Sequence, residues 1–261
     1  SDGCGWKNYP RDIALDRPTN SLYDGISCLL RILRHLPSFR NYDVVQLISP
    51  YFLHLRSERT LPAYHYLRRF NGKVFLGAFG TDYYYIRACM ETDTYRYSDF
   101  KTGNCYRDTD FNKMTLQDWY YGGAAHATRT IAESCNGIMA CLWEYYVAYQ
   151  LLFPEKTAFV PLPINLHKIV SRIRTVPEIL NFFIGIQNFK DTVKGTDVML
   201  PVLQEVQRKH PDLCRITEVH DVPYARYQQL MDDADVQLDQ LYSYTPSMNS
   251  LLAMAKGVTV V

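Results

Sequence analysis

The sequence predicts an α/β protein with two domains, each built around a parallel sheet. Continuous apolar runs of strand length, at residues 42–49 and 73–78, alternate with segments of helical periodicity, a pattern typical of buried parallel strands. The alternation restarts after a stretch at 161–177 that holds three prolines and favours a crossover between domains. With 47% apolar and 21% charged residues, the composition is that of a globular protein with a sizeable core.

Residues 1–165 are predicted to form the first domain. Leu22, Ile26, Leu29, Leu30 and Leu33 recur at three- and four-residue steps and predict a helix before the first strand. A second helical pattern covers 64–69, after Pro62. The rest of this domain is predicted as a helix at 118–133, a strand at 137–141, a helix at 142–152 and a strand at 157–161.

Residues 166–261 are predicted to form the second domain. Its helices are expected at 196–210, 223–232 and 248–256, with Pro223 opening the second and Gly257 ending the third. Its strands are expected at 179–185, 215–220, 235–239 and from 257 onward. Because the chain opens on Ser1 and ends within an apolar strand, we expect an excerpt of a longer protein. The first strand of the first domain would be missing and the second domain would be incomplete at its end.

Charge and cysteine usage exclude several classes of protein. The 28 basic and 27 acidic residues leave no basic excess for nucleic acid. Seven scattered cysteines without a Cys-x-x-Cys pair are typical of a reducing compartment, and they predict neither a disulfide framework nor a metal site. The sequence shows no apolar run of about 18 residues and no leader. These features predict a cytoplasmic protein without a bound metal.

Polar residues follow two predicted strands of the second domain. Gly185, Gln187 and Asn188 come at the end of one strand, and Lys194 with Gly195 stands before the next helix. In parallel sheets, ligands bind at the carboxyl ends of strands, where helix N–H groups attract phosphate. An ammonium beside a glycine at such a place suits a diphosphate. The alternative is a solvated lysine before a helix.

A second group of polar residues precedes the helix at 248–256. Tyr244, Ser247, Met248 and Asn249 stand where backbone donors and side chains can hold a nucleotide or a sugar. The alternative is helix capping by Ser247 or Asn249 without any ligand.

Three segments in order carry a resemblance to a known family. They are FIG…KG at 183–195, VHDVPYARYQQLMDDADVQLDQ at 219–240 and SMNSLLAMAKGVTVV at 247–261. This set resembles the nucleotide-sugar-binding half of GT-B-type glycosyltransferases of the large retaining sugar-transferase family, glycosyl transferases group 1. In the first half, AFGTD at 78–82 and FVPLPIN at 159–165 are similar to the family's acceptor-side loop and interdomain crossing.

The resemblance implies two Rossmann-like domains that face each other across a cleft. It implies transfer of a sugar from a nucleoside-diphosphate donor to a hydroxyl acceptor, with retained configuration, no metal and no cofactor beyond the donor substrate. Gly185, Gln187, Asn188, Lys194, Gly195, Tyr244, Ser247, Met248 and Asn249 would bind the donor, and Lys194 would stabilise the leaving diphosphate. Carbohydrate or lipid-linked acceptors and a role in polysaccharide biosynthesis are expected.

On the acceptor side, the residues expected to line the site are Gly80, Thr81, Asp82 and Tyr84. The Asp82 carboxylate would orient an acceptor hydroxyl or stabilise charge developing on the sugar. Its alternative is a cap for the helix around Tyr84. Tyr84 would stack on a sugar face, or else belong to the core.

The sequence departs from the family at several of its site positions. Tyr244 and Leu252 stand where the family has glutamates, Ile186 where it has an arginine and Phe79 where it has a histidine. The hypothesis is therefore that Tyr244 or Asn249 binds the ribose in place of a glutamate. Two other functions stay open: a nucleotide-sugar epimerase or phosphorylase on the same fold, and a non-catalytic nucleotide- or sugar-binding module.

The location of the protein leaves one further alternative. Lys168, Arg172 and Arg174 mark either peripheral contact with the inner face of the membrane or a solvated linker.

Overall fold

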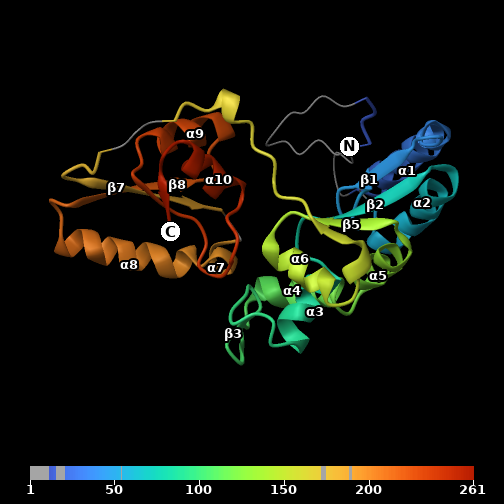
Figure 1. Ribbon diagram of the computed structural model, residues 1–261, viewed down its shortest axis with the longest axis horizontal. Helices are drawn as coiled ribbons and strands as arrows, with labels where there is room; N and C mark the ends of the chain where they lie inside the picture. The colour runs from blue at the N-terminus through green and yellow to red at the C-terminus, as the bar shows by residue number, and fades with distance from the viewer. Residues whose placement is uncertain (1–11, 16–20, 54, 172–174, 188–189) are drawn as a thin grey trace. The chain divides into compact units, whose positions relative to one another are not determined.

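The computed structural model describes residues 12–15, 21–53, 55–171, 175–187 and 190–261 (Figure 1). The chain divides into two compact units. Unit 1 comprises residues 1–95 and 113–161, and unit 2 comprises residues 96–112 and 162–261. Each unit contains one four-stranded sheet whose strands are all parallel, which confirms the predicted α/β class.

The sheet of unit 1 has the strand order β1-β2-β5-β6. Three of its strands are slightly shorter than the apolar runs that predict them, and β2 agrees residue for residue. The bounds are β1 Val44–Leu47, β2 Lys73–Ala78, β5 Gly137–Ala140 and β6 Thr157–Phe159. The four carboxyl ends therefore lie along one edge, as expected for a parallel sheet.

Among the described residues, six α-helices belong wholly or in part to unit 1: α1 Leu22–His35, α2 Ser57–Phe70, α3 Tyr83–Glu91, α4 Asp110–Trp119, α5 Gly123–Ser134 and α6 Trp143–Gln150. The single helix predicted at 118–133 is wrong, because α4 ends and α5 begins within that range. The chain turns at Gly122, where an added Cβ would lie 2.7 Å from the Gln117 carbonyl oxygen. A larger residue cannot make this turn without a shift of the backbone.

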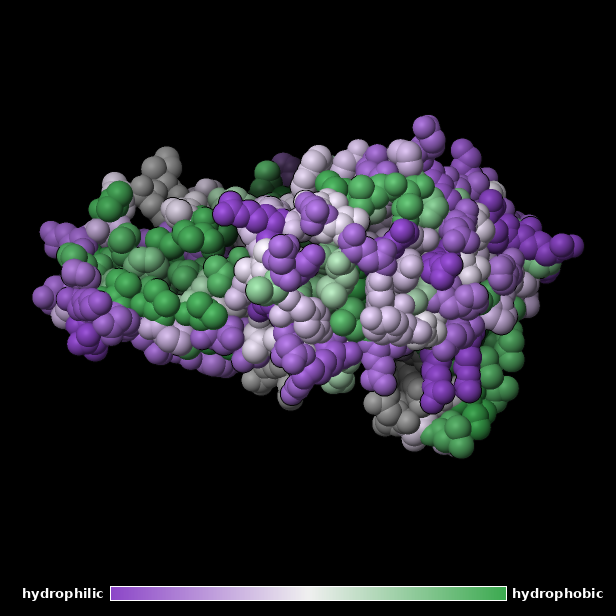
Figure 2. Space-filling view, turned by 90° about the horizontal axis from the view of Figure 1, so that it is seen from below, coloured by the Kyte–Doolittle hydropathy of each residue, from purple (hydrophilic) through white to green (hydrophobic). Residues whose placement is uncertain are grey.

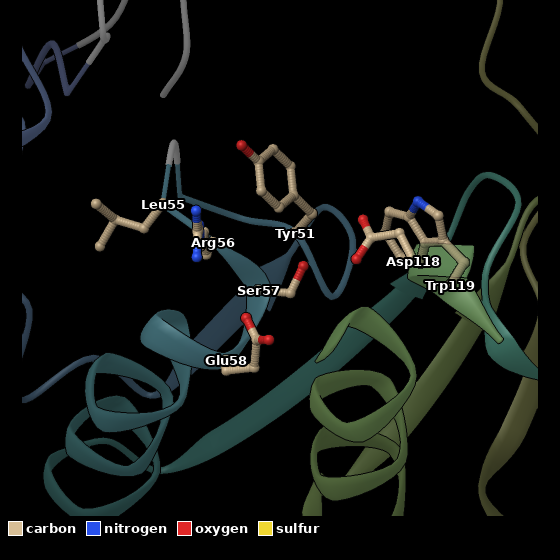
Figure 3. Close-up of a pocket in the computed structure, with 7 residues that line it drawn as sticks. All are labelled: Tyr51, Leu55, Arg56, Ser57, Glu58, Asp118 and Trp119. Atoms are coloured by element: carbon tan, nitrogen blue, oxygen red, sulfur yellow. The ribbon is translucent and has the colours of Figure 1, made fainter. Parts of the chain in front are cut away.

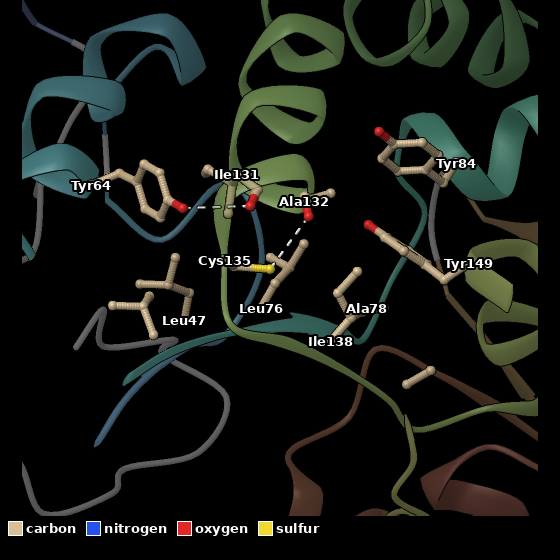
Figure 4. Close-up of a cluster of buried hydrophobic side chains, with 12 residues drawn as sticks. Leu47, Tyr64, Leu76, Ala78, Tyr84, Ile131, Ala132, Cys135, Ile138 and Tyr149 are labelled. Atoms are coloured by element: carbon tan, nitrogen blue, oxygen red, sulfur yellow. Dashed lines mark hydrogen bonds between the residues drawn. The ribbon is translucent and has the colours of Figure 1, made fainter. Parts of the chain in front are cut away.

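The main core of unit 1 lies on one face of its sheet. Figure 4 shows Tyr64 of α2, Ile131 of α5 and Tyr149 of α6 meeting side chains of the strands, among them Leu76 and Ile138. These five residues are all almost completely buried. The Tyr64 hydroxyl lies 2.7 Å from the Ser134 hydroxyl, so its polar end is hydrogen-bonded inside the core.

Helix α1 forms as predicted, but the residues that predict it do not face the core. Leu22, Ile26, Leu29, Leu30 and Leu33 are between 43% and 80% exposed. The buried side of α1 instead carries Cys28 and Ile32, which pack with Leu15 and Leu55. The periodicity therefore identifies the helix correctly without identifying its buried face.

The sheet of unit 2 has the order β10-β9-β7-β8. Its strands are β7 Leu180–Ile186, β8 Cys214–His220, β9 Val236–Leu238 and β10 Thr259–Val260. Its helices are α7 Asp191–Lys194, α8 Thr196–Lys209, α9 Tyr224–Asp232 and α10 Met248–Ala255. In Figure 1, α8 covers one face of this sheet, and α9 and α10 cover the other. Three of these helices agree with the predictions to within one residue at each end, whereas α7 was not predicted.

Helix α8 buries Leu203 against the sheet and leaves an apolar stripe outside. Val198, Val202 and Val206 are 45%, 60% and 41% exposed and recur every four residues. Figure 2 shows apolar surface gathered at the end of the view that carries unit 2.

Residues 96–112 belong to unit 2, although they lie in the range predicted as the first domain. They contain a short antiparallel hairpin formed by β3 Lys101–Thr102 and β4 Cys105–Tyr106. The main division between the units falls between 161 and 162. Unit 2 is thus built from two separate stretches of sequence.

Gly195 joins α7 to α8 in a conformation that favours glycine. Its φ is +78°, in the left-handed region, and its N–H donates to the Asp191 carbonyl at 2.8 Å. An added Cβ would lie 2.6 Å from Leu241 Cβ and 2.9 Å from the Tyr242 ring. Backbone strain and lack of space both exclude a side chain here.

Gly195→Ala is expected to destabilise unit 2 by about 1–3 kcal/mol, because it combines an unfavourable φ with a steric clash. The described tryptophans, Trp119 and Trp143, lie in unit 1, so hydrogen exchange of β7 and β9 amides under increasing urea is the suitable measurement for unit 2. Gly80→Ala is the matched control, since an added Cβ there meets nothing within 4 Å. Equal protection of the β7 and β9 amides in the two variants would show that position 195 does not require glycine.

Candidate functional site

The candidate site lies at the carboxyl edge of the unit 2 sheet. Strands β7 and β9 are neighbours there, and the chain beyond each runs toward the start of a helix. The two connections are joined by the N–H of Leu241, which donates to the Lys194 carbonyl oxygen at 2.7 Å. The loop between β9 and α10 is therefore held against the turn that precedes α8.

The carboxylate of Asp239 organises this edge. It is only 4% exposed and comes directly after β9. Its Oδ1 lies 3.3 Å from Lys194 Nζ, and its Oδ2 accepts hydrogen bonds from the hydroxyls of Ser247, at 2.6 Å, and Ser250. A buried carboxylate needs such partners, because its desolvation is otherwise unfavourable by several kcal/mol.

Both helices that begin at this edge lack a side-chain cap. Gly195 precedes α8 and has no side chain. Ser247 precedes α10, but its hydroxyl donates to Asp239 and caps no backbone N–H. The predicted alternative of helix capping by Ser247 is therefore wrong. In neither helix does a side chain cap the first N–H groups, and in α8 the Val198 N–H donates to the Gly195 carbonyl oxygen at 3.1 Å.

The segment 96–112 packs on the loop between β9 and α10. The Arg107 guanidinium lies 3.4 Å from the centre of the Tyr242 ring, and its NH groups donate to the carbonyl oxygens of Thr192 and Asp99. The rings of Tyr97 and Tyr244 are stacked 4.3 Å apart. These contacts fix the positions of two aromatic side chains of the candidate site.

The remaining predicted donor residues are distributed around the same edge. Gly185 lies within β7, where an added Cβ would lie 2.9 Å from the Tyr227 ring, so it serves the packing of α9 on the sheet. Gln187 follows β7 directly. Met248 and Asn249 form the first turn of α10, with Met248 37% exposed. Asn188 lies outside the described residues.

Asp239 and Arg107 were not predicted as site residues. Asp239 ends an alternating strand, VQLD, and a charged residue at such a place is a usable signal. Arg107 carries no signal, because it meets Tyr242 across 135 positions of sequence through a contact that only the tertiary structure creates.

Asp82 does not face a crevice as predicted. It is 2% exposed and caps α3, with Oδ1 accepting from the N–H groups of Tyr84 and Tyr85. Its Oδ2 accepts a hydrogen bond of 2.7 Å from the buried Tyr149 hydroxyl. Burial raises the pKa of the Asp82 carboxyl to about 6, although these hydrogen bonds oppose the rise. The capping alternative is the one that the structure shows.

The other predicted acceptor-side residues surround the start of α3. Gly80 and Thr81 form the connection from β2 and are half-buried. Tyr84 is 4% exposed, with its ring 4.9 Å from that of Tyr149 and 5.2 Å from that of Phe153. Tyr84 is thus a core residue, and the expectation that it stacks on a sugar is wrong.

Within the described part of the chain, no group of three or more His, Cys, Asp or Glu side chains is arranged to hold a metal ion. None of the described helices is both long and apolar enough to cross a membrane.

Comparisons with known proteins give a likeness to solved structures alone. No family model and no curated protein matches the sequence. A solved structure of a variant of S. aureus TarM, in complex with Fondaparinux, alpha-GlcNAc-glycerol and UDP, matches with 9% sequence identity and a TM-score of 0.49. The match covers 78% of this chain and 39% of that chain, so this chain spans well under half of TarM's length.

The raised pKa of Asp82 predicts a pH-dependent stability of unit 1. Its ordinary pKa is 3.8, so between about pH 4 and 6 the native state binds more protons than the unfolded state. The free energy of unfolding should therefore fall as pH rises through this window. Asp82→Asn keeps an oxygen that can accept from Tyr84 and Tyr85 but does not titrate.

Urea unfolding followed by tryptophan fluorescence reports unit 1. The stability of the wild type relative to Asp82→Asn should fall by on the order of 1–3 kcal/mol between pH 4 and pH 7. Parallel pH profiles for the two proteins would show that Asp82 does not titrate in this range.

Arg107→Ala is expected to loosen the loop between β9 and α10, because it removes two hydrogen bonds and the contact with Tyr242. The amide of Leu241 should then exchange its hydrogen at least tenfold faster, as measured by NMR. Arg208→Ala is the control, since Arg208 pairs with Glu205 on the exposed surface of α8. Unchanged exchange in Arg107→Ala would show that the segment does not support the loop.

Proposed function

We propose that this protein transfers a sugar from a nucleoside-diphosphate donor to a hydroxyl acceptor, and that unit 2 binds the donor. One observation supports the proposal above all. The starts of α8 and α10 have no side-chain cap, and Asp239 links them by contacting both Lys194, just before α8, and Ser247, just before α10. Few ligands suit such a place better than a diphosphate, which brings negative charge to N–H groups and an ammonium.

The chemistry of this edge fits the departure of a diphosphate. When a glycosidic bond to a nucleoside diphosphate breaks, negative charge accumulates on the leaving phosphate oxygens. The Lys194 ammonium has three donors, so it can keep Asp239 as a partner and still donate to a phosphate oxygen. The starts of α8 and α10 add partial positive charge that is already oriented before the ligand binds.

In this proposal Asp239 acts as a positioning residue. It holds the ammonium at 3.3 Å and draws the Ser247 and Ser250 hydroxyls toward itself. The N–H groups at the start of α10 are thereby left for the ligand. The loop residue Tyr244 is stacked on Tyr97 and 42% exposed, and its hydroxyl accepts a hydrogen bond of 3.1 Å from the Tyr97 N–H. We propose a retaining reaction in which these groups stabilise the leaving phosphate without a metal ion.

A second candidate is a module that binds a nucleotide or nucleotide sugar without transferring it. The observation that favours it is the burial of Asp82, which is the carboxylate that the transfer mechanism expects on the acceptor side. With Asp82 caught between Tyr149 and the α3 backbone, the described part of unit 1 offers no carboxylate at the predicted position. Product analysis with nucleotide sugars and candidate acceptors distinguishes the two functions.

Nucleoside-diphosphate binding is tested by calorimetric melting with UDP, GDP, ADP and CDP. A ligand at about 100 times its Kd stabilises the native state by about 2.7 kcal/mol, so one base should raise the Tm by several degrees. Lys194→Ala should abolish most of this rise. Lys209→Ala, which removes an exposed lysine of α8 that pairs with Glu205, should preserve it.

No rise with any of the four nucleotides would overturn the proposed function. A rise that survives Lys194→Ala would place the diphosphate elsewhere. A rise without any sugar transfer or release would support the binding module.

A further inference from the structure

A pocket in unit 1 lies apart from every residue considered so far. Its volume is about 580 Å³, within the roughly 300–1,000 Å³ range of small-molecule sites. The chain that follows β1 and enters α2 forms one side, and the end of α4 forms the other (Figure 3). Its lining residues are Tyr51, Leu55, Arg56, Ser57, Glu58, Asp118 and Trp119.

Two aromatic side chains and one aliphatic side chain give the pocket apolar walls. Trp119 is half-buried at the end of α4, and Tyr51 is 40% exposed on the opposite loop. Leu55 is buried and packs against the α1 core. Rings that are anchored but incompletely covered offer flat apolar faces to a ligand at little cost in side-chain entropy.

Charged groups stand between these walls. Asp118 and Arg56 are exposed, and within the described chain neither makes a side-chain hydrogen bond or ion pair. In Figure 3 the Asp118 carboxylate points from the end of α4 toward the loop that carries Tyr51. The pocket therefore presents a carboxylate acceptor and a guanidinium donor that are free for a ligand.

Glu58 adds a second carboxylate, on the exposed side of the first turn of α2. It packs so closely on Gly123 that an added Cβ there would lie 1.7 Å from Glu58 Oε1. Gly123 is the first residue of α5, and a negative charge is favourable at a helix start. The absence of a side chain at Gly123 thus makes room for the carboxylate that borders the pocket.

The combination of these groups identifies the class of ligand. One arginine and two carboxylates give the pocket a net negative charge, which disfavours phosphate and other anions. The Arg56 guanidinium in turn disfavours a cation beside it. A neutral ring rich in hydroxyls matches the pocket best, because it can accept from Arg56, donate to Asp118 and place C–H groups on the aromatic rings. We propose that this pocket binds a neutral carbohydrate, with Trp119 and Tyr51 against the sugar ring and Asp118 accepting from its hydroxyls.

This inference goes beyond the proposed function, because the site lies in unit 1 and its occupancy needs no nucleotide. Failure of saccharide binding would leave the donor site untouched, and failure of nucleotide binding would leave this pocket untouched.

The test uses the full chain, labelled with a fluorophore, on an array of neutral, sulfated and carboxylated glycans in the absence of nucleotides. The wild type should bind at least one neutral glycan. That glycan, in soluble form, is then titrated by calorimetry into the wild type and the variants. Trp119→Ala and Asp118→Asn should each weaken binding about tenfold or more, since each removes a main contact.

One control variant and the conservative change at Asp118 keep the result interpretable. Trp143→Ala removes a 52% exposed tryptophan of α6 outside the pocket and should bind as the wild type does. Asp118→Asn preserves shape, so the test remains decisive if Trp119→Ala does not fold. The proposal is overturned if no neutral glycan binds, if only acidic glycans bind, or if neither pocket variant changes the affinity.

Discussion

The carboxylate of Asp239 is the interaction on which the candidate site depends. It stands at the end of a central strand, nearly excluded from water, and accepts from Lys194, Ser247 and Ser250. An unpaired charge in this position would destabilise the fold, so the partners are required by the fold as much as by any ligand. The start of α10 and the turn before α8 meet because both contribute a partner to this one group.

The two units use a buried aspartate after a strand in different ways. In unit 1, Asp82 follows β2 by four residues and binds backbone N–H groups and the Tyr149 hydroxyl, with no cation. In unit 2, Asp239 has a lysine partner and leaves the helix N–H groups uncapped. In unit 1 the aspartate itself caps the first N–H groups of α3. In unit 2 the aspartate binds Ser247 instead, so the start of α10 has no side-chain cap and can bind a ligand. This contrast is the physical reason for assigning the donor to unit 2.

The regular elements could be predicted from the sequence because their signals are local. The run at 73–78 gives β2 without error, and the pattern at 196–210 gives α8 to within one residue. Helix α3 was expected only as the helix around Tyr84 that Asp82 would cap, without bounds, because five of its nine residues are buried and only Arg87 and Glu91 mark its exposed side. The site was found only in part: Lys194, Gly195 and Ser247 follow from strand ends, whereas the burial of Asp82 depends on Tyr149, 67 residues away.

The two-part origin of unit 2 has a consequence for how the chain folds. Residues 96–112 are synthesised before the end of unit 1, yet their partners Thr192, Tyr242 and Tyr244 emerge from the ribosome roughly 80 to 150 residues later. During translation the segment 96–112 therefore lacks these partners until long after the rest of unit 1 has been synthesised. Such long-range closure is slow compared with local helix formation. A fragment that begins at residue 162 would therefore lack the surface that holds its own loop in place.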